Sequence, residues 1–237
     1  MVFERIGEAF RFWSSNLGAI VLVTLPFALV SAALEIATGA NNVDLEQFQL
    51  TTGLAIYALS AVLVTAFAEA ALVAQLAAIQ HGKARSLPDC LLFALAKGPG
   101  ILAIYLLMGF ALVPLVALIG VPLVGLAAFA GLVWLYVRLS LAAFIYALED
   151  ESPLRALRHS FVRTDAMQWP MLGAWLLTGL IIMCSLALIG ALLVELLGQG
   201  AGTSVLLKAT VAILGATLNV LLFRFYGLSR QSADPMD

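Results

Sequence analysis

The sequence predicts an all-α polytopic membrane protein, and three observations lead to this fold class. Hydrophobic residues fill 63% of the 237 positions and charged residues only 11%, whereas soluble domains carry about 25% charged residues. The apolar residues form runs of about 20 or more, the length of a helix that crosses a bilayer. Backbone groups in lipid must form hydrogen bonds within the chain, which makes such spans helical. We therefore expect one integral membrane domain, residues 1–237, built as a bundle of six transmembrane helices.

The six predicted spans follow one another as three helical hairpins. Polar or glycine-rich connections separate the spans, whose approximate limits are residues 17–37, 54–79, 100–119, 123–148, 170–196 and 205–225. The first span is longer than the apolar run of about 7–15 residues in a signal peptide, so we expect it to be retained. Pro26, Pro114 and Pro122 are candidate positions for breaks in these helices.

A short amphipathic segment precedes each hairpin, at residues 1–16, 86–97 and 152–165. The second and third begin with Ser86 and Ser152, each followed by a proline within two residues. Serine can cap free N–H groups, and proline in the first helical turn loses no hydrogen bond. Apolar residues opposite charged ones suit a helix that lies in the headgroup plane. We expect three repeats, each an interfacial helix followed by a hairpin.

Positive charge is distributed unevenly along the chain. Of its 12 Lys and Arg residues, ten lie near the termini or in two internal connections, and the other three connections hold none. The remaining two, Arg138 and Lys208, lie inside apolar segments. Cytoplasmic loops collect Lys and Arg, so we expect both termini in the cytoplasm. The basic residues alternate with acidic ones and form no basic domain, which argues against nucleic acid as a partner.

Three polar residues inside the spans form a candidate site: Glu69, Arg138 and Asn219. Each lies 11 or 12 positions from a polar residue at the cytoplasmic flank, or roughly 16–18 Å along an unbroken helix. Ionisable groups inside a membrane are costly and usually face a partner in the bundle. We expect Arg138 to contact Glu69, with Asn219 nearby. Such a cluster is either a ligand site or a buried ion pair that fixes helix register.

The third amphipathic segment carries candidate contacts to anionic lipid, namely Arg155, Arg158 and Arg163. No residue spacing indicates a metal site or a cofactor, because His81 and His159 lie in different connections without organised carboxylates or thiols. No nucleophile elbow, phosphate loop or paired catalytic carboxylates occur either.

Two segments of the chain resemble a broad group of bacterial membrane proteins. They are Tyr136-Val137-Arg138-Leu139-Ser140-Leu141 and the stretch from Leu148 to Phe161, which reads Leu-Glu-Asp-Glu-Ser-Pro-Leu-Arg-Ala-Leu-Arg-His-Ser-Phe. The group includes the YciC-like uncharacterised inner-membrane proteins and the membrane domain joined to some glycerophosphodiester phosphodiesterases. The resemblance implies a six-helix bundle in the bacterial cytoplasmic (inner) membrane and no established activity. No long polar segment exists here for a soluble phosphodiesterase domain.

These observations favour a non-enzymatic membrane protein that belongs to the envelope or associates with lipid. A small transporter or permease with a polar site between spans two, four and six is the alternative, and an intramembrane enzyme comes third. Membrane lipids are the expected partners, and a second copy of the chain or another membrane protein remains open as a further one.

Overall fold

The computed structural model describes residues 2–39, 52–121, 124–198 and 200–233, and all regular structure within these ranges is helical. This confirms the all-α part of the predicted fold class for the described residues. Residues 40–51 of the connection between the first two predicted spans lie outside these ranges, as does Pro122. The helices are α1 (Val2–Ser15), α2 (Leu17–Thr38), α3 (Thr52–Gln80), α4 (Leu87–Leu118), α5 (Val124–Leu139), α6 (Ala142–Glu149), α7 (Pro153–Arg163), α8 (Gln168–Leu197) and α9 (Ala201–Ala233). A 3-10 turn, Asp165–Met167, joins α7 to α8.

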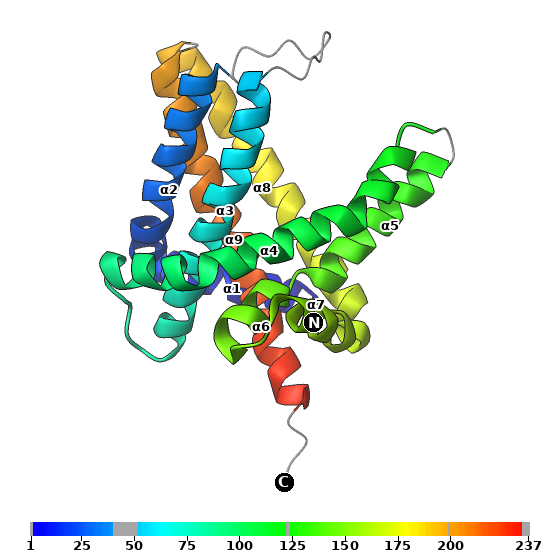
Figure 1. Cartoon of the computed structure of the whole chain (residues 1–237). Coiled ribbons are helices and arrows are strands. Elements are labelled where there is room, and N and C mark those ends of the chain that lie inside the picture. The colour runs from blue at the N-terminus through cyan, green and yellow to red at the C-terminus, as the bar shows by residue number, and fades with distance from the viewer. Residues whose placement is uncertain (1, 40–51, 122–123, 199, 234–237) are drawn as a thin grey trace.

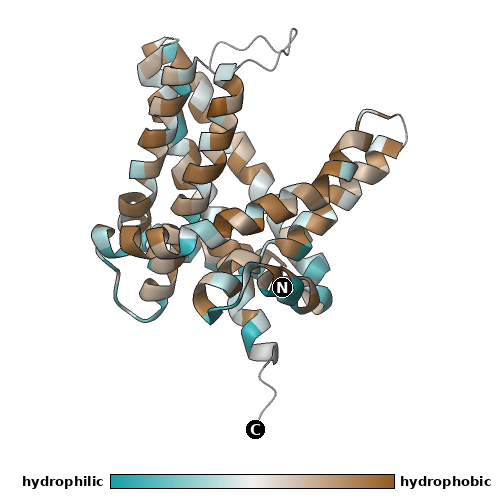
Figure 2. Cartoon of the chain, viewed as in Figure 1, coloured by the Kyte–Doolittle hydropathy of each residue, from teal (hydrophilic) through white to brown (hydrophobic). Residues whose placement is uncertain are grey.

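Six helical segments of the described chain are long and apolar enough to cross a membrane, with α5 and α6 together forming the fourth. They make the hairpins α2–α3, α4–α5 and α8–α9, whose tips point away from the end of the molecule that holds both termini (Figure 1). We call that end the terminal end. Hydrophilic residues gather there (Figure 2), whereas Phe110 and Leu126 on the second hairpin are 76% and 77% exposed. The chain is therefore a multi-pass membrane protein.

The segment 86–97 differs from its prediction as a separate interfacial helix. Ser86 caps a single helix, α4, that continues without interruption to Leu118 through Pro99 and Pro114. Close packing holds this helix through the Lys97–Gly100 region. A Cβ atom at Gly98 would lie 2.9 Å from the Phe67 ring, and one at Gly100 would overlap Tyr146. Pro26 likewise lies inside the continuous helix α2, so neither Pro26 nor Pro114 ends a helix.

A break divides the predicted fourth span into α5 and α6, and α7 supplies the hydrogen bonds that the break removes. The buried Ser160 hydroxyl of α7 donates to the Arg138 carbonyl oxygen at 2.8 Å and accepts from the Leu141 N–H at 3.2 Å. Thr164 also donates to the Arg138 carbonyl, at 3.2 Å. The break thus brings together the two segments that carry the resemblance to bacterial membrane proteins.

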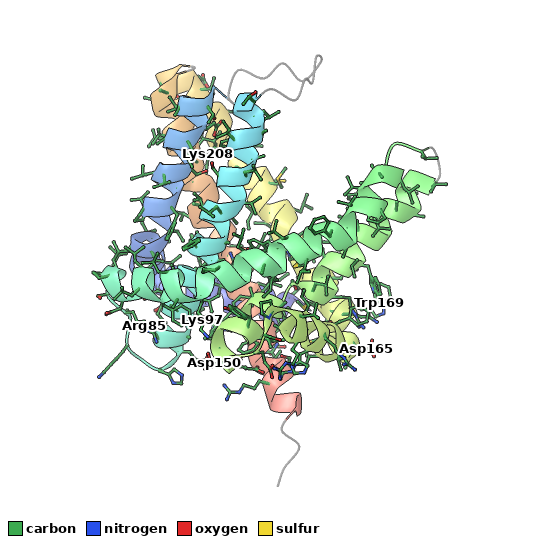
Figure 3. The ribbon with its side chains drawn as sticks, viewed as in Figure 1. Arg85, Lys97, Asp150, Asp165, Trp169 and Lys208 are labelled. Carbon is green, nitrogen blue, oxygen red and sulfur yellow. The ribbon has the colours of Figure 1, made fainter. Side chains whose placement is uncertain are left out.

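Ion pairs fix α6 and α7 against their neighbours at the terminal end. Arg163 forms two parallel hydrogen bonds with Glu149, of 2.6 and 2.8 Å, and Tyr226 of α9 donates to the same carboxylate at 3.0 Å. The bonds to Glu149 raise the pKa of Arg163 above its ordinary value. Lys97 of α4 pairs with Asp150, which follows α6 in a left-handed conformation (Figure 3). These contacts join α4, α6, α7 and α9.

Candidate functional site

A partly open cavity of about 440 Å³ lies between the helices of the bundle, walled by α2, α3, α4, α5 and α9 with Trp175 of α8 and Ala143 of α6. This volume falls within the range of about 300–1,000 Å³ that is typical of small-molecule sites. Most of its wall is apolar, with side chains such as Phe27, Leu72 and Met108. A mainly apolar wall with a few polar groups suits an amphiphilic ligand better than a hydrated ion.

The polar groups in this cavity come from different helices. Glu69 of α3 and Asn219 of α9, both predicted as site residues, line the same space as Tyr136 of α5. The ion pairs of the described residues do not include Glu69. A carboxylate at this depth is costly unless it receives hydrogen bonds or meets a cation. A molecule in the cavity would supply such a group.

Arg138 does not join this cluster, which corrects the predicted contact with Glu69. Its guanidinium donates to Asp165 at 2.6 Å and to Gln168 at 3.3 Å. The cation also lies 4.0 Å from the centre of the Phe161 ring, a distance that allows a cation–π interaction. The Arg138 side chain is only 5% exposed, whereas that of Asp165 is 73% exposed. The Arg138 contacts are therefore structural, and they lie at the edge of the bundle.

Arg138 misses Glu69 because of the helix face that it occupies: its neighbours Tyr136 and Leu139 line the cavity, whereas Arg138 itself contacts Asp165 and Gln168. The predicted depth of Arg138 also assumed an unbroken helix from Arg138 to the next polar connection, and the structure has a break there. α5 ends at Leu139, and α6 then packs with α7 at the terminal end (Figure 1). The rise of 1.5 Å per residue no longer measures depth once the helix axis turns. Asp165 lies at this same end of the molecule (Figure 3). Glu69 and Asn219 lie in the continuous helices α3 and α9, where no such break occurs.

Lys208 forms a second charged contact, which links α9 to α2 and α3. Its ammonium group lies 2.7 Å from a carboxylate oxygen of Glu35 on α2 and donates to the Tyr57 hydroxyl of α3 at 3.0 Å. Lys208 also lines the cavity and lies toward the hairpin tips (Figure 3). The contact joins α2, α3 and α9 on that side of the cavity. Only spatial proximity identifies it, because the three residues are far apart in the sequence.

The structure places the predicted lipid-contact residues Arg155, Arg158 and Arg163 on α7 with different surroundings. Arg163 is bound by Glu149, and Arg155 lies 3.6 Å from Glu151. Arg158 is exposed and is the one of the three without a carboxylate partner in the described chain. Their contact with anionic lipid remains a prediction. No group of three or more His, Cys, Asp or Glu side chains among the described residues is arranged to hold a metal ion.

Comparison with known proteins leaves the site to be interpreted from its own geometry. No protein-family model matches the chain, and the comparisons with curated proteins and with solved structures also give no match.

Proposed function

We propose that this protein is a non-enzymatic, lipid-associated protein of the bacterial cytoplasmic membrane that holds one amphiphilic molecule in the cavity between its helices. The observation that carries the proposal is the position of Glu69, a carboxylate without an ion-pair partner in the described chain, on the wall of a largely apolar cavity. The apolar wall suits an acyl chain or another hydrocarbon group. Glu69, Asn219 and Tyr136 suit a polar group that donates hydrogen bonds or carries positive charge.

Native mass spectrometry of the protein, released from its own membrane in mild detergent, tests this proposal. We expect the wild-type protein to retain one molecule that contains a hydrocarbon portion and a donor or cationic group. Glu69→Gln should reduce retention about tenfold or more, because a charge-assisted hydrogen bond contributes about 1.5–3 kcal/mol. Glu195→Gln is the matched control, since Glu195 is exposed and does not line the cavity. Equal retention by both variants would exclude the proposed role of Glu69.

Transport of a small molecule is the second candidate, and the contact of Lys208 with Glu35 favours it. Lys208 lines the cavity toward the hairpin tips and is paired there with Glu35. Opening of the cavity on this side would require the ion pair to separate. Lys208→Met should then abolish substrate-dependent flux in proteoliposomes while the cavity still binds its ligand. Ligand binding without any flux in the wild-type protein would exclude transport, and the lipid-associated function would be the one that remains.

A further inference from the structure

A second hollow lies at the terminal end, between α1 and α9, and its wall is basic. Three arginines line it, together with one acidic side chain and small polar groups: Arg5, Glu8, Arg11, Phe12, Ser15, Asn16 and Arg224. None of these residues lines the intramembrane cavity. A site in this hollow therefore does not require a ligand in the intramembrane cavity.

The single carboxylate of the hollow is already engaged. Glu8 accepts a hydrogen bond from Arg5 at 2.8 Å, one helical turn away on α1. Arg11 and Arg224 have no ion pair with any described residue. The hollow therefore presents an excess of two positive charges from two different helices.

Packing holds Arg224 in the wall of this hollow. Its guanidinium carbon lies 4.7 Å from the centre of the Phe12 ring, and its Nε is buried without an acceptor among the described atoms. A fixed, planar guanidinium with free donors matches the geometry of a phosphate or carboxylate group. Arg11 is exposed and contributes positive charge at the rim.

We propose that the hollow between α1 and α9 binds a phosphate group through Arg224 and Arg11. Basic pockets beside membrane helices bind the headgroups of anionic lipids, and α1 is an amphipathic helix whose Phe3 is 79% exposed. Free phosphate carries the same chemical group, so the two sources need separate tests. The site differs from the lipid contacts that the sequence predicts on α7, where Glu149 already binds Arg163.

Lipid retention by single variants tests the site. The protein is placed in bilayers of phosphatidylglycerol and phosphatidylcholine, released in mild detergent and measured by native mass spectrometry. We expect Arg224→Gln and Arg11→Gln each to lower phosphatidylglycerol retention about tenfold, the loss that corresponds to one charge-assisted hydrogen bond. Arg230→Gln removes the same charge from an exposed position of the same helix and should stay within about twofold of wild type. Equal losses of phosphatidylglycerol retention in Arg11→Gln and Arg230→Gln would overturn the proposal.

Thermal unfolding in detergent without lipid distinguishes the two sources of phosphate. If inorganic phosphate raises the unfolding temperature of the wild-type protein but not of Arg224→Gln, the site accepts free phosphate. If only phosphatidylglycerol protects the wild type, and Arg224→Gln loses that protection, the site is specific for a lipid headgroup. Arg224→Lys keeps the charge without the planar fork and should show intermediate protection. Protection that is absent, or equal in the wild type and Arg224→Gln, would contradict a phosphate site.

Discussion

Arg138 donates a hydrogen bond of 2.6 Å to Asp165, 27 positions later in the chain. This contact joins the end of α5 to the turn before α8. A buried cation that loses its carboxylate is left without its main partner, so Asp165→Asn should lower the free energy of unfolding by about 1–3 kcal/mol. The measurement is reversible unfolding in mild detergent.

The same measurement separates this pair from the one that the sequence suggested. A double-mutant cycle of Arg138→Leu with Asp165→Asn should show coupling of about 1 kcal/mol or more. A cycle of Arg138→Leu with Glu69→Gln should be additive within about 0.5 kcal/mol, as expected of residues that do not touch. Strong coupling of Arg138 to Glu69 would contradict the position that the structure gives to Arg138.

Ser160 is expected to be the most sensitive hydroxyl of the α5–α6 break. Ser160→Ala removes the donor to the Arg138 carbonyl and the acceptor for the Leu141 N–H in a fully buried position. The free energy of unfolding should fall by about 1–3 kcal/mol, because a buried group is left unsatisfied. Ser185→Ala is the control, since the exposed Ser185 hydroxyl bonds only to its own helix. A loss as large in the control would show that the break does not depend on Ser160.

Arg163 should contribute to stability, whereas Arg158 should not. Arg163→Gln disrupts the two parallel bonds to Glu149, and both side chains are about four-fifths buried (20% and 19% exposed). We expect a loss of about 1–3 kcal/mol in the free energy of unfolding. Arg158→Gln, an exposed position on the same helix, should change it by less than about 0.5 kcal/mol. Indistinguishable stabilities for the two variants would mean that the bonds of Arg163 to Glu149 are dispensable.

The orientation in the membrane can be tested by cysteine labelling. The two native cysteines are replaced first: the exposed Cys184 by serine and the buried Cys90 by alanine. A membrane-impermeant reagent added to intact cells should label Gly120→Cys, at a hairpin tip, and should not label Lys83→Cys, at the terminal end. Cell lysis should make Lys83→Cys reactive. Labelling of Lys83→Cys in intact cells would place the terminal end on the outer side of the membrane and contradict the predicted orientation.

The six spans could be predicted from sequence because their signal is local and strong. Long apolar runs separated by polar connections specify membrane helices without reference to the rest of the chain. Glu69 and Asn219 could also be found, since a polar residue inside a continuous apolar helix is conspicuous and both line one cavity.

Three features depend on tertiary packing and were not predictable in this way. The break at Ser140–Leu141 occurs inside an apolar run, and its hydrogen bonds come from Ser160 on another helix. The partner of Lys208 lies on α2 rather than beside it in the sequence. The hollow around Arg224 requires α1 to pack against α9. A periodic pattern identifies helices but not which helices meet.

Filling the cavity tests the central claim most directly. Gly215 lines the cavity, and a Cβ atom there would meet no atom within 4 Å, so a side chain introduced by Gly215→Leu would begin in open space at the cavity wall. Gly179→Leu is the matched control, because Gly179 has equally open surroundings and does not line the cavity. We predict that the wild type and Gly179→Leu retain one amphiphilic molecule in native mass spectrometry, whereas Gly215→Leu retains none and unfolds at a similar temperature. Retention of the same molecule by a folded Gly215→Leu would contradict a ligand site in this cavity.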